Sequence, residues 1–124
     1  MSREIKFRAW QKKYKEMYEV NCIDWEAEFV WVKYYDDDRE EWFSREEHFA
    51  DLELMQYTGL KDKNGIEIYE GDKIFDGSNN YYVEFKHGMF KPICYASLDN
   101  ECNAWGYKVI GNIYENPELL EANS

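Results

Sequence analysis

The sequence predicts a mainly β fold, because of its aromatic content, its alternating side chains and its turn residues. Tryptophan, tyrosine and phenylalanine make up 19% of the chain, and such rings favour pleated, half-buried surfaces. Apolar and polar residues alternate over several stretches, which is the pattern of strands with one buried face. Glycine and asparagine separate these stretches where hairpin turns need them. With 124 residues the chain can bury a core without disulfides or metal.

The first 35 residues predict three strands of a β-meander. Ile5, Phe7 and Ala9 lie on one phase of an alternating run, and a second such run covers residues 17–23. Residues 29–35 are apolar on both faces, which favours a central or doubly covered strand. Cys22 falls on the apolar phase of the second run, so we expect it to be a small core side chain.

A short helix is expected at residues 45–51. Ser44 and Glu47 have the spacing of a capping box, in which each side chain can bond to the backbone N–H of the other residue. Phe49 and Leu52 would form a narrow apolar stripe. A strand is expected to follow at residues 54–58.

The second half of the chain predicts about five short strands joined by tight turns. Gly65, Gly71 and Gly88 each stand in a turn sequence, Asn-Gly, Glu-Gly-Asp and His-Gly respectively. This spacing is typical of a small curled sheet or an SH3-like barrel. Asn116 followed by Pro117 predicts one helical turn close to the C-terminus.

Two subdomains are therefore expected. Residues 1–58 would form an N-terminal β-rich subdomain with the short helix near residues 45–51. Residues 59–124 would form an SH3-like barrel subdomain with a short C-terminal helical turn.

The formal net charge of −11 is distributed unevenly. Residues 1–20 hold six basic and three acidic side chains, whereas residues 36–54 hold nine acidic and two basic ones. An acidic surface repels phosphate backbones, so a nucleic-acid partner is not expected. The acidic stretch leaves open the alternative of a nucleic-acid mimic that competes with DNA for a basic protein.

No pattern typical of catalysis, cofactor binding or metal binding is present, and we assign no residue to these roles. Cys22, Cys94 and Cys102 lack zinc-ligand spacing. His48 and His87 could act as bases at neutral pH, but neither stands in a catalytic motif. Chance neighbours among 26 acidic residues keep a carboxylate-based enzyme as an alternative.

The N-terminus has no hydrophobic signal segment, and no apolar run approaches the length of a membrane span. We therefore expect a cytoplasmic protein with no membrane partner.

Five motifs give the chain a family resemblance. They are EIKFRAW at residues 4–10, LMQYTGL at 54–60, KDKNG at 61–65, EIYEGD at 67–72 and VIGNIYENPELL at 109–120. With them the chain resembles the YopX-like family, which phages and prophages of Gram-positive bacteria encode. The resemblance implies a mainly β fold with a C-terminal SH3-like barrel and a phage or prophage origin, and it implies no activity. Gln11 departs from the acidic residue that the family pattern would place after Trp10.

We expect a non-catalytic phage accessory protein that binds a host or phage protein, with homo-oligomerisation as a further option. Five tryptophans are more than one small core usually seals, and exposed rings beside an acidic rim suit a protein interface. The candidate interface residues are Trp10, Trp31, Trp42, Tyr57 and Tyr69. The alternative is that the rings fill the core, and the motifs around Tyr57 and Tyr69 also suit fold-specifying positions.

Overall fold

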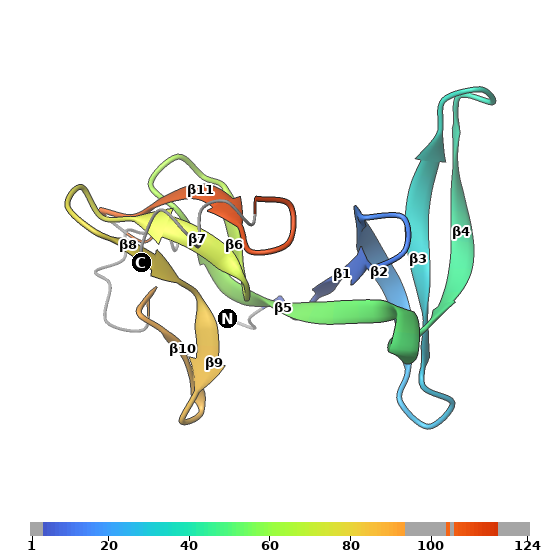
Figure 1. The fold of residues 1–124 in the computed structure, drawn as a ribbon, viewed down its shortest axis with the longest axis horizontal. Coiled ribbons are helices and arrows are strands. Elements are labelled where there is room, and N and C mark those ends of the chain that lie inside the picture. Colours follow the sequence, from blue (N-terminus) through green and yellow to red (C-terminus); the bar gives the residue numbers. More distant parts are fainter. Residues whose placement is uncertain (1–3, 94–103, 105, 117–124) are drawn as a thin grey trace. The chain divides into compact units, whose positions relative to one another are not determined.

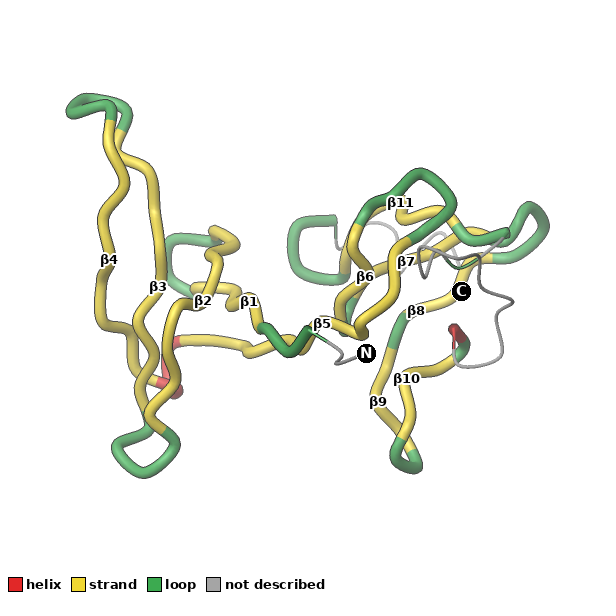
Figure 2. Tube along the Cα trace, turned by 180° about the vertical axis from the view of Figure 1, so that it is seen from behind, coloured by secondary structure: helices red, strands yellow, loops and turns green. Residues whose placement is uncertain are grey.

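The computed structural model describes residues 4–93, 104 and 106–116, and the chain divides into two compact units. The N-terminal unit is Lys6–Met55, and the C-terminal unit combines Gln56–Ser124 with Met1–Ile5. Figures 1 and 2 show the strands of both units from opposite sides. Strands dominate the described residues, so the predicted mainly β class is confirmed. Within those residues, no helix reaches the length and apolarity that crossing a bilayer demands.

Four consecutive antiparallel strands and the start of a fifth form the sheet of the N-terminal unit. The strands are β1 (Phe7–Gln11), β2 (Glu16–Asp24), β3 (Phe29–Asp36), β4 (Glu41–His48) and β5 (Leu52–Lys61). Sequential strands pair with each other, and the order across the sheet is β4-β3-β2-β1-β5. The predicted meander is present, and β3 lies between two partners, as its apolar sequence indicates (Figure 1).

One face of this sheet, here called the inner face, carries the core of the N-terminal unit. Side chains alternate between the two faces along a strand, and directly paired residues share a face. Ala9, Val30, Val32 and Leu52 are buried there, and partly buried Tyr18, Val20, Ile23, Phe49 and Leu54 pack against them. Burying each of the larger aliphatic side chains contributes about 1.5–3 kcal/mol, so this cluster is the main apolar support of the unit.

The prediction that Cys22 is a core side chain is wrong, because Cys22 is exposed. The pairing of β2 with β3 shifts by one residue between Val20 and Cys22, which is a β-bulge. A bulge moves the residues that follow it to the opposite face, so Ile23 rather than Cys22 reaches the core.

The prediction of a helix at residues 45–51 is also wrong for most of this range. Ser44 pairs with Lys33 and Glu47 with Val30 in the β3–β4 ladder, so β4 continues to His48. Only a 3₁₀ turn, Phe49–Asp51, follows. The ladder satisfies the backbone groups that a capping box would have satisfied, and it also brings Glu47 to a buried position.

Arg45 is the polar centre of the inner face. Its guanidinium lies 5.0–5.3 Å from the ring centroids of Tyr14, Tyr18 and Tyr34. It donates to the Tyr18 hydroxyl at 2.9 Å, and its Nε lies 2.8 Å from Oε1 of Glu47. Desolvation alone would lower the pKa of Arg45, but the hydrogen bond to Tyr18 and the charge of Glu47 raise it on balance. The group therefore stays charged among the rings.

We expect Arg45→Lys to lower the free energy of unfolding by about 1 kcal/mol and Arg45→Ala by about 2 kcal/mol. An ammonium keeps the charge but cannot reproduce the planar fork, whereas alanine leaves Glu47 without its ion pair. Urea unfolding followed by tryptophan fluorescence measures both. The control is Lys12→Ala, which breaks the exposed pair of Lys12 and Glu53 at 3.3 Å and should cost less than about 0.5 kcal/mol. Equal losses for Arg45→Ala and Lys12→Ala would contradict this account.

The C-terminal unit consists of short strands in separate open sheets. After the second part of β5 come β6 (Glu67–Tyr69), β7 (Asp72–Phe75), β8 (Asn80–Tyr82), β9 (Glu84–Lys86), β10 (Met89–Lys91) and β11 (Lys108–Asn112). β5 pairs with β6, β7 lies between β11 and β8, and β9 pairs with β10. An SH3-like closure of these sheets stays a prediction. Their core is a cluster of Ile68, Ile74, Val83, Phe90, Ile93 and Ala104.

The predicted turns of this unit are present. Gly65 has a φ of +82° in the turn between β5 and β6, and His87 and Gly88 both have positive φ between β9 and β10. Two successive positive φ angles are what a two-residue hairpin loop with the correct twist requires. The predicted helical turn after Asn116 lies outside the described residues, as do Cys94, Cys102 and Trp105.

Candidate functional site

The strand register places three tryptophans on the face of the N-terminal sheet opposite its core, here called the outer face. Trp10 pairs with Met17, and Glu19, two residues further along β2, pairs with Lys33. Along β3, Trp31 and Tyr35 stand two residues on either side of Lys33, and Tyr35 pairs with Trp42. Since paired residues share a face and alternate residues return to it, Trp10, Trp31 and Trp42 belong to one surface.

The rings of this surface are exposed to a degree that is unusual for tryptophan. The exposed fractions are 40% for Trp31, 45% for Tyr35 and 58% for Trp42, whereas Trp10 is half-buried. Tyr35 and Trp42 meet edge to face with their centroids 5.3 Å apart. The Lys33 ammonium lies 4.6 Å from the centroid of the Trp42 ring, within the range of a cation–π interaction. We call Trp10, Trp31, Lys33, Tyr35 and Trp42 the aromatic face.

A hollow of about 350 Å³ is lined by residues of β2, β3 and β4. Met17, Glu19, Lys33, Tyr35 and Trp42 line it from the aromatic face, whereas Glu16, Tyr18 and Tyr34 belong to the phase of the inner face. Glu16 accepts a hydrogen bond of 2.6 Å from the Tyr18 hydroxyl, and burial together with this bond raises the pKa of Tyr18. On the aromatic face the hollow therefore combines exposed rings with one carboxylate, Glu19, and one ammonium, Lys33, so it is a polar and aromatic surface rather than a purely apolar pocket.

The other two candidate interface residues lie elsewhere. Tyr57 and Tyr69 pair across β5 and β6 in the C-terminal unit, and both side chains are buried. Their ring centroids are 5.4 Å apart. These tyrosines therefore contribute to the interior of their unit, which is the fold-specifying role that their motifs also suited.

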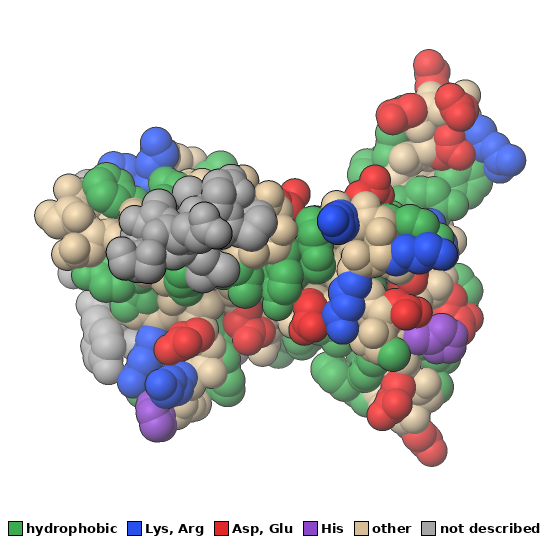
Figure 3. All heavy atoms as spheres, viewed as in Figure 1, with side chains coloured by type: hydrophobic (Ala, Val, Ile, Leu, Met, Phe, Trp, Pro, Cys, Tyr) green, Lys and Arg blue, Asp and Glu red, His purple; other side chains and the backbone are tan. Residues whose placement is uncertain are grey.

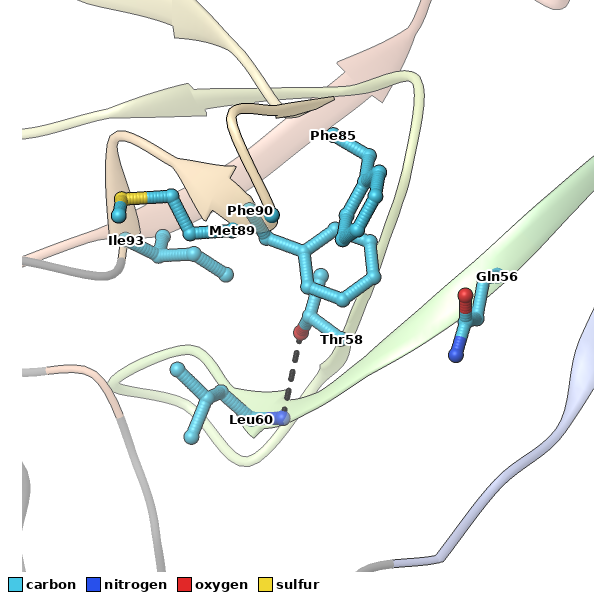
Figure 4. Close-up of a pocket in the computed structure, with 8 residues that line it drawn as sticks. Gln56, Thr58, Leu60, Phe85, Met89, Phe90 and Ile93 are labelled. Atoms are coloured by element: carbon cyan, nitrogen blue, oxygen red, sulfur yellow. Dashed lines mark hydrogen bonds between the residues drawn. The ribbon is translucent and has the colours of Figure 1, made fainter.

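The C-terminal unit has a hollow of its own, of about 440 Å³, between β5 and the β9–β10 hairpin (Figure 4). Gln56, Thr58 and Leu60 line it from β5, and Phe85, Gly88, Met89, Phe90 and Ile93 line the rest. The Thr58 hydroxyl is already engaged, since it donates to the Ile68 carbonyl at 2.7 Å. It also accepts from the Leu60 N–H at 3.2 Å, which is the bond drawn in Figure 4. Among the described residues that line it, apolar side chains predominate and none is ionisable.

The groups that could carry catalysis do not converge in the described part of the chain. His48 Nε2 lies 3.9 Å from Glu46 Oε1 at the end of β4, and both side chains are largely exposed. His87 lies in the exposed β9–β10 turn of the other unit. Among residues 4–93, 104 and 106–116, no group of three or more histidine, cysteine, aspartate or glutamate side chains could hold a metal ion.

The comparisons with known proteins place the chain in a family. The crystal structure of protein EF1440 from Enterococcus faecalis is similar, with a TM-score of 0.68 and 29% sequence identity. This similarity covers 96% of the present chain and 99% of that one. None of the curated proteins matches the chain. The model of the family described as YopX protein matches residues 6–121, so the chain belongs to the YopX family.

Proposed function

We propose that the protein is a non-catalytic, protein-binding accessory protein of a phage or prophage, which acts in the cytoplasm of the host bacterium through its aromatic face. The family resemblance in the sequence motifs supports the phage origin. The binding role is supported by the surface itself. The partner is a host or phage protein.

The observation that supports this function best is the exposure of Trp31, Tyr35 and Trp42 on neighbouring strands. Exposed aromatic rings cost free energy in water, and tryptophan and tyrosine are enriched among the residues that dominate binding energy at interfaces. These three rings stand on a paired sheet, so little conformational entropy is lost when a partner covers them. A rigid, partly apolar surface of this kind suits a protein partner.

The proposal can be tested by capture from a host lysate, followed by measurement of Kd for the purified partner. We expect Trp31→Ala/Trp42→Ala to weaken binding by at least about 30-fold, since one interface hot spot contributes about 2 kcal/mol or more. Both side chains are substantially exposed, so the circular dichroism spectrum of the variant should match that of the wild type.

The matched control is Phe85→Ala, which removes a ring that is 54% exposed in the C-terminal unit. It should change Kd less than about twofold. A partner that is lost with Phe85→Ala and kept with Trp31→Ala/Trp42→Ala would move the binding site to the hollow of the C-terminal unit and contradict the proposal. Light scattering could instead show a wild-type dimer that Trp31→Ala/Trp42→Ala dissociates. In that case the aromatic face would bind a second copy of this chain.

A further inference from the structure

The β3–β4 hairpin ends in an acidic tip next to the aromatic face. The tip, residues 36–41, has five carboxylates and one guanidinium. Figure 3 shows acidic side chains gathered at this end of the hairpin, and Arg39 is the basic residue within positions 36–41. Oδ1 of Asp36 accepts from the backbone N–H groups of Asp38 and Arg39 at 2.9 and 3.2 Å, so Asp36 shapes the turn. The tip therefore carries a concentrated negative charge in a defined turn.

The basic group of the tip is already engaged, because the Arg39 guanidinium lies 5.4 Å from the centroid of the Phe43 ring. Asp36 pairs with Glu41 on the rung that follows the pair of Tyr35 and Trp42, so these two side chains lie on the inner face. Asp37, Asp38 and Glu40 belong to the turn beyond this rung. A partner that extends from the rings past the end of the hairpin would thus meet the carboxylates of the turn.

The Trp42 ring accepts a cation within the chain itself. Lys33 lies 4.6 Å from its centroid, and this pair borders the same hollow as Glu19, which stands on the same face. A ring with an electron-rich face and flanking carboxylates attracts guanidinium and ammonium groups and repels anions. The charges on the hairpin tip extend this preference over a surface several residues long.

We propose that the partner presents a segment rich in arginine and lysine, whose cationic side chains bind Trp42 and Tyr35 and the acidic tip. This inference rests on the proposed function and names the chemistry of its partner. An extended segment places alternate side chains about 7 Å apart on one side, which suits successive contacts with rings and carboxylates along a hairpin. Arginine fits best, since its planar guanidinium can stack on a ring and bond to a carboxylate at once.

Bulk charge is the competing explanation, because any basic peptide is attracted to a protein of net charge −11. Two triple variants separate the explanations, since both remove three negative charges. Asp37→Asn/Asp38→Asn/Glu40→Gln changes the turn of the tip and spares Asp36, which holds the turn. Glu26→Gln/Glu28→Gln/Glu84→Gln changes three exposed carboxylates that are not part of the tip.

The probe is a synthetic peptide with four alternating arginine and serine pairs, and its binding is measured by isothermal titration calorimetry. At about 50 mM NaCl we expect the tip variant and Trp42→Ala each to weaken binding about tenfold, and the control triple variant less than about twofold. Raising NaCl to about 500 mM should weaken wild-type binding strongly, because exposed charges are screened. A peptide with glutamate in place of arginine should not bind.

Three outcomes would overturn the inference: equal weakening by the two triple variants, full binding to Trp42→Ala, or no binding of the arginine peptide to the wild type. If the last outcome occurs while a captured partner still depends on Trp31 and Trp42, the basic partner is excluded and the proposed function stands. If the arginine peptide binds as expected but no protein partner needs these rings, the proposed function fails instead.

Discussion

Asp62→Ala is expected to lower the free energy of unfolding of the C-terminal unit by about 3–5 kcal/mol. The Asp62 side chain is fully buried. Its Oδ1 accepts from the backbone N–H groups of Asn64 and Ile66 at 2.8 and 2.9 Å, and its Oδ2 accepts from the N–H of Val109 at 2.8 Å. One carboxylate therefore holds the β5–β6 turn and ties it to β11. Alanine would leave three N–H groups without their acceptor, and each such loss costs about 1–3 kcal/mol when the group is buried.

Urea unfolding followed by far-ultraviolet circular dichroism measures the loss, and amide hydrogen exchange locates it. Exchange should accelerate first at Asn64, Ile66 and Val109. Asp62→Asn should cost less, because one amide oxygen can still accept the two turn N–H groups while the bond from Val109 is lost.

Asp76 provides the matched control for Asp62. Its Oδ1 likewise accepts from two turn N–H groups, those of Ser78 and Asn79, at 2.8 and 2.7 Å, but this turn lies at the surface. These bonds hold the pKa of Asp76 below its ordinary value, so its contribution is present at neutral pH and disappears as the pH falls through that pKa. Asp76→Ala should be much milder than Asp62→Ala, since water can replace the lost acceptor. Similar losses for the two variants would refute the role given to burial.

Gln11→Glu is expected to destabilise the N-terminal unit by about 2 kcal/mol at neutral pH. Gln11 is buried, and its Nε2 donates to Oε2 of Glu47 at 3.2 Å. Its Oε1 accepts from the N–H groups of Lys13 and Tyr14 at 2.7 and 2.9 Å. A carboxylate could still accept these turn bonds, but it could not donate, and it would lie beside a second carboxylate of the same charge.

The penalty for Gln11→Glu should depend on pH. Repulsion by Glu47 raises the pKa of the introduced carboxyl in the folded state above its unfolded value of about 4.3. The free energy of unfolding then falls, relative to the wild type, as the pH rises from about 4 towards neutral, and the deficit shrinks below that range. Urea unfolding at several pH values measures this trend.

The rescue variant Gln11→Glu/Glu47→Gln restores a donor opposite the new carboxylate and should recover part of the stability. An additive double variant would show that the two positions do not interact. In this chain an acidic residue at position 11 would need a neutral or basic neighbour at position 47.

The elements of this fold that are local in sequence could be predicted, whereas those that depend on register could not. Gly65 and Gly88 have positive φ, and the glycine in each turn sequence predicts such a turn without knowledge of the rest of the fold. By contrast, the bulge that exposes Cys22 exists only in the pairing of β2 with β3. Ser44 and Glu47 have true capping-box spacing, but pairing with β3 overrides that local preference.

The candidate site shows the same limit. Residue type alone selected Trp31 and Trp42 as interface residues, and it equally selected Tyr57 and Tyr69, because tyrosine suits both interiors and surfaces. The grouping of Trp10, Trp31 and Trp42 on one face, and the presence of Lys33 and Tyr35 among them, follows from the order and register of four strands. The exposed side of a sheet is defined only once its core side is known.

The sequential pairing of β1 to β4 has a consequence for how the chain reaches its native state. Each hairpin joins neighbours in sequence, so little loop entropy is lost when it closes, and low contact order favours rapid folding. In the C-terminal unit, Ile74 on β7 pairs with Val109 on β11, so the two strands of this pair are much further apart in sequence than those of the N-terminal hairpins. The N-terminal half leaves the ribosome first and should therefore acquire its structure while β11 is still being synthesised. The pairing of β11 with β7 should be the slow step of folding.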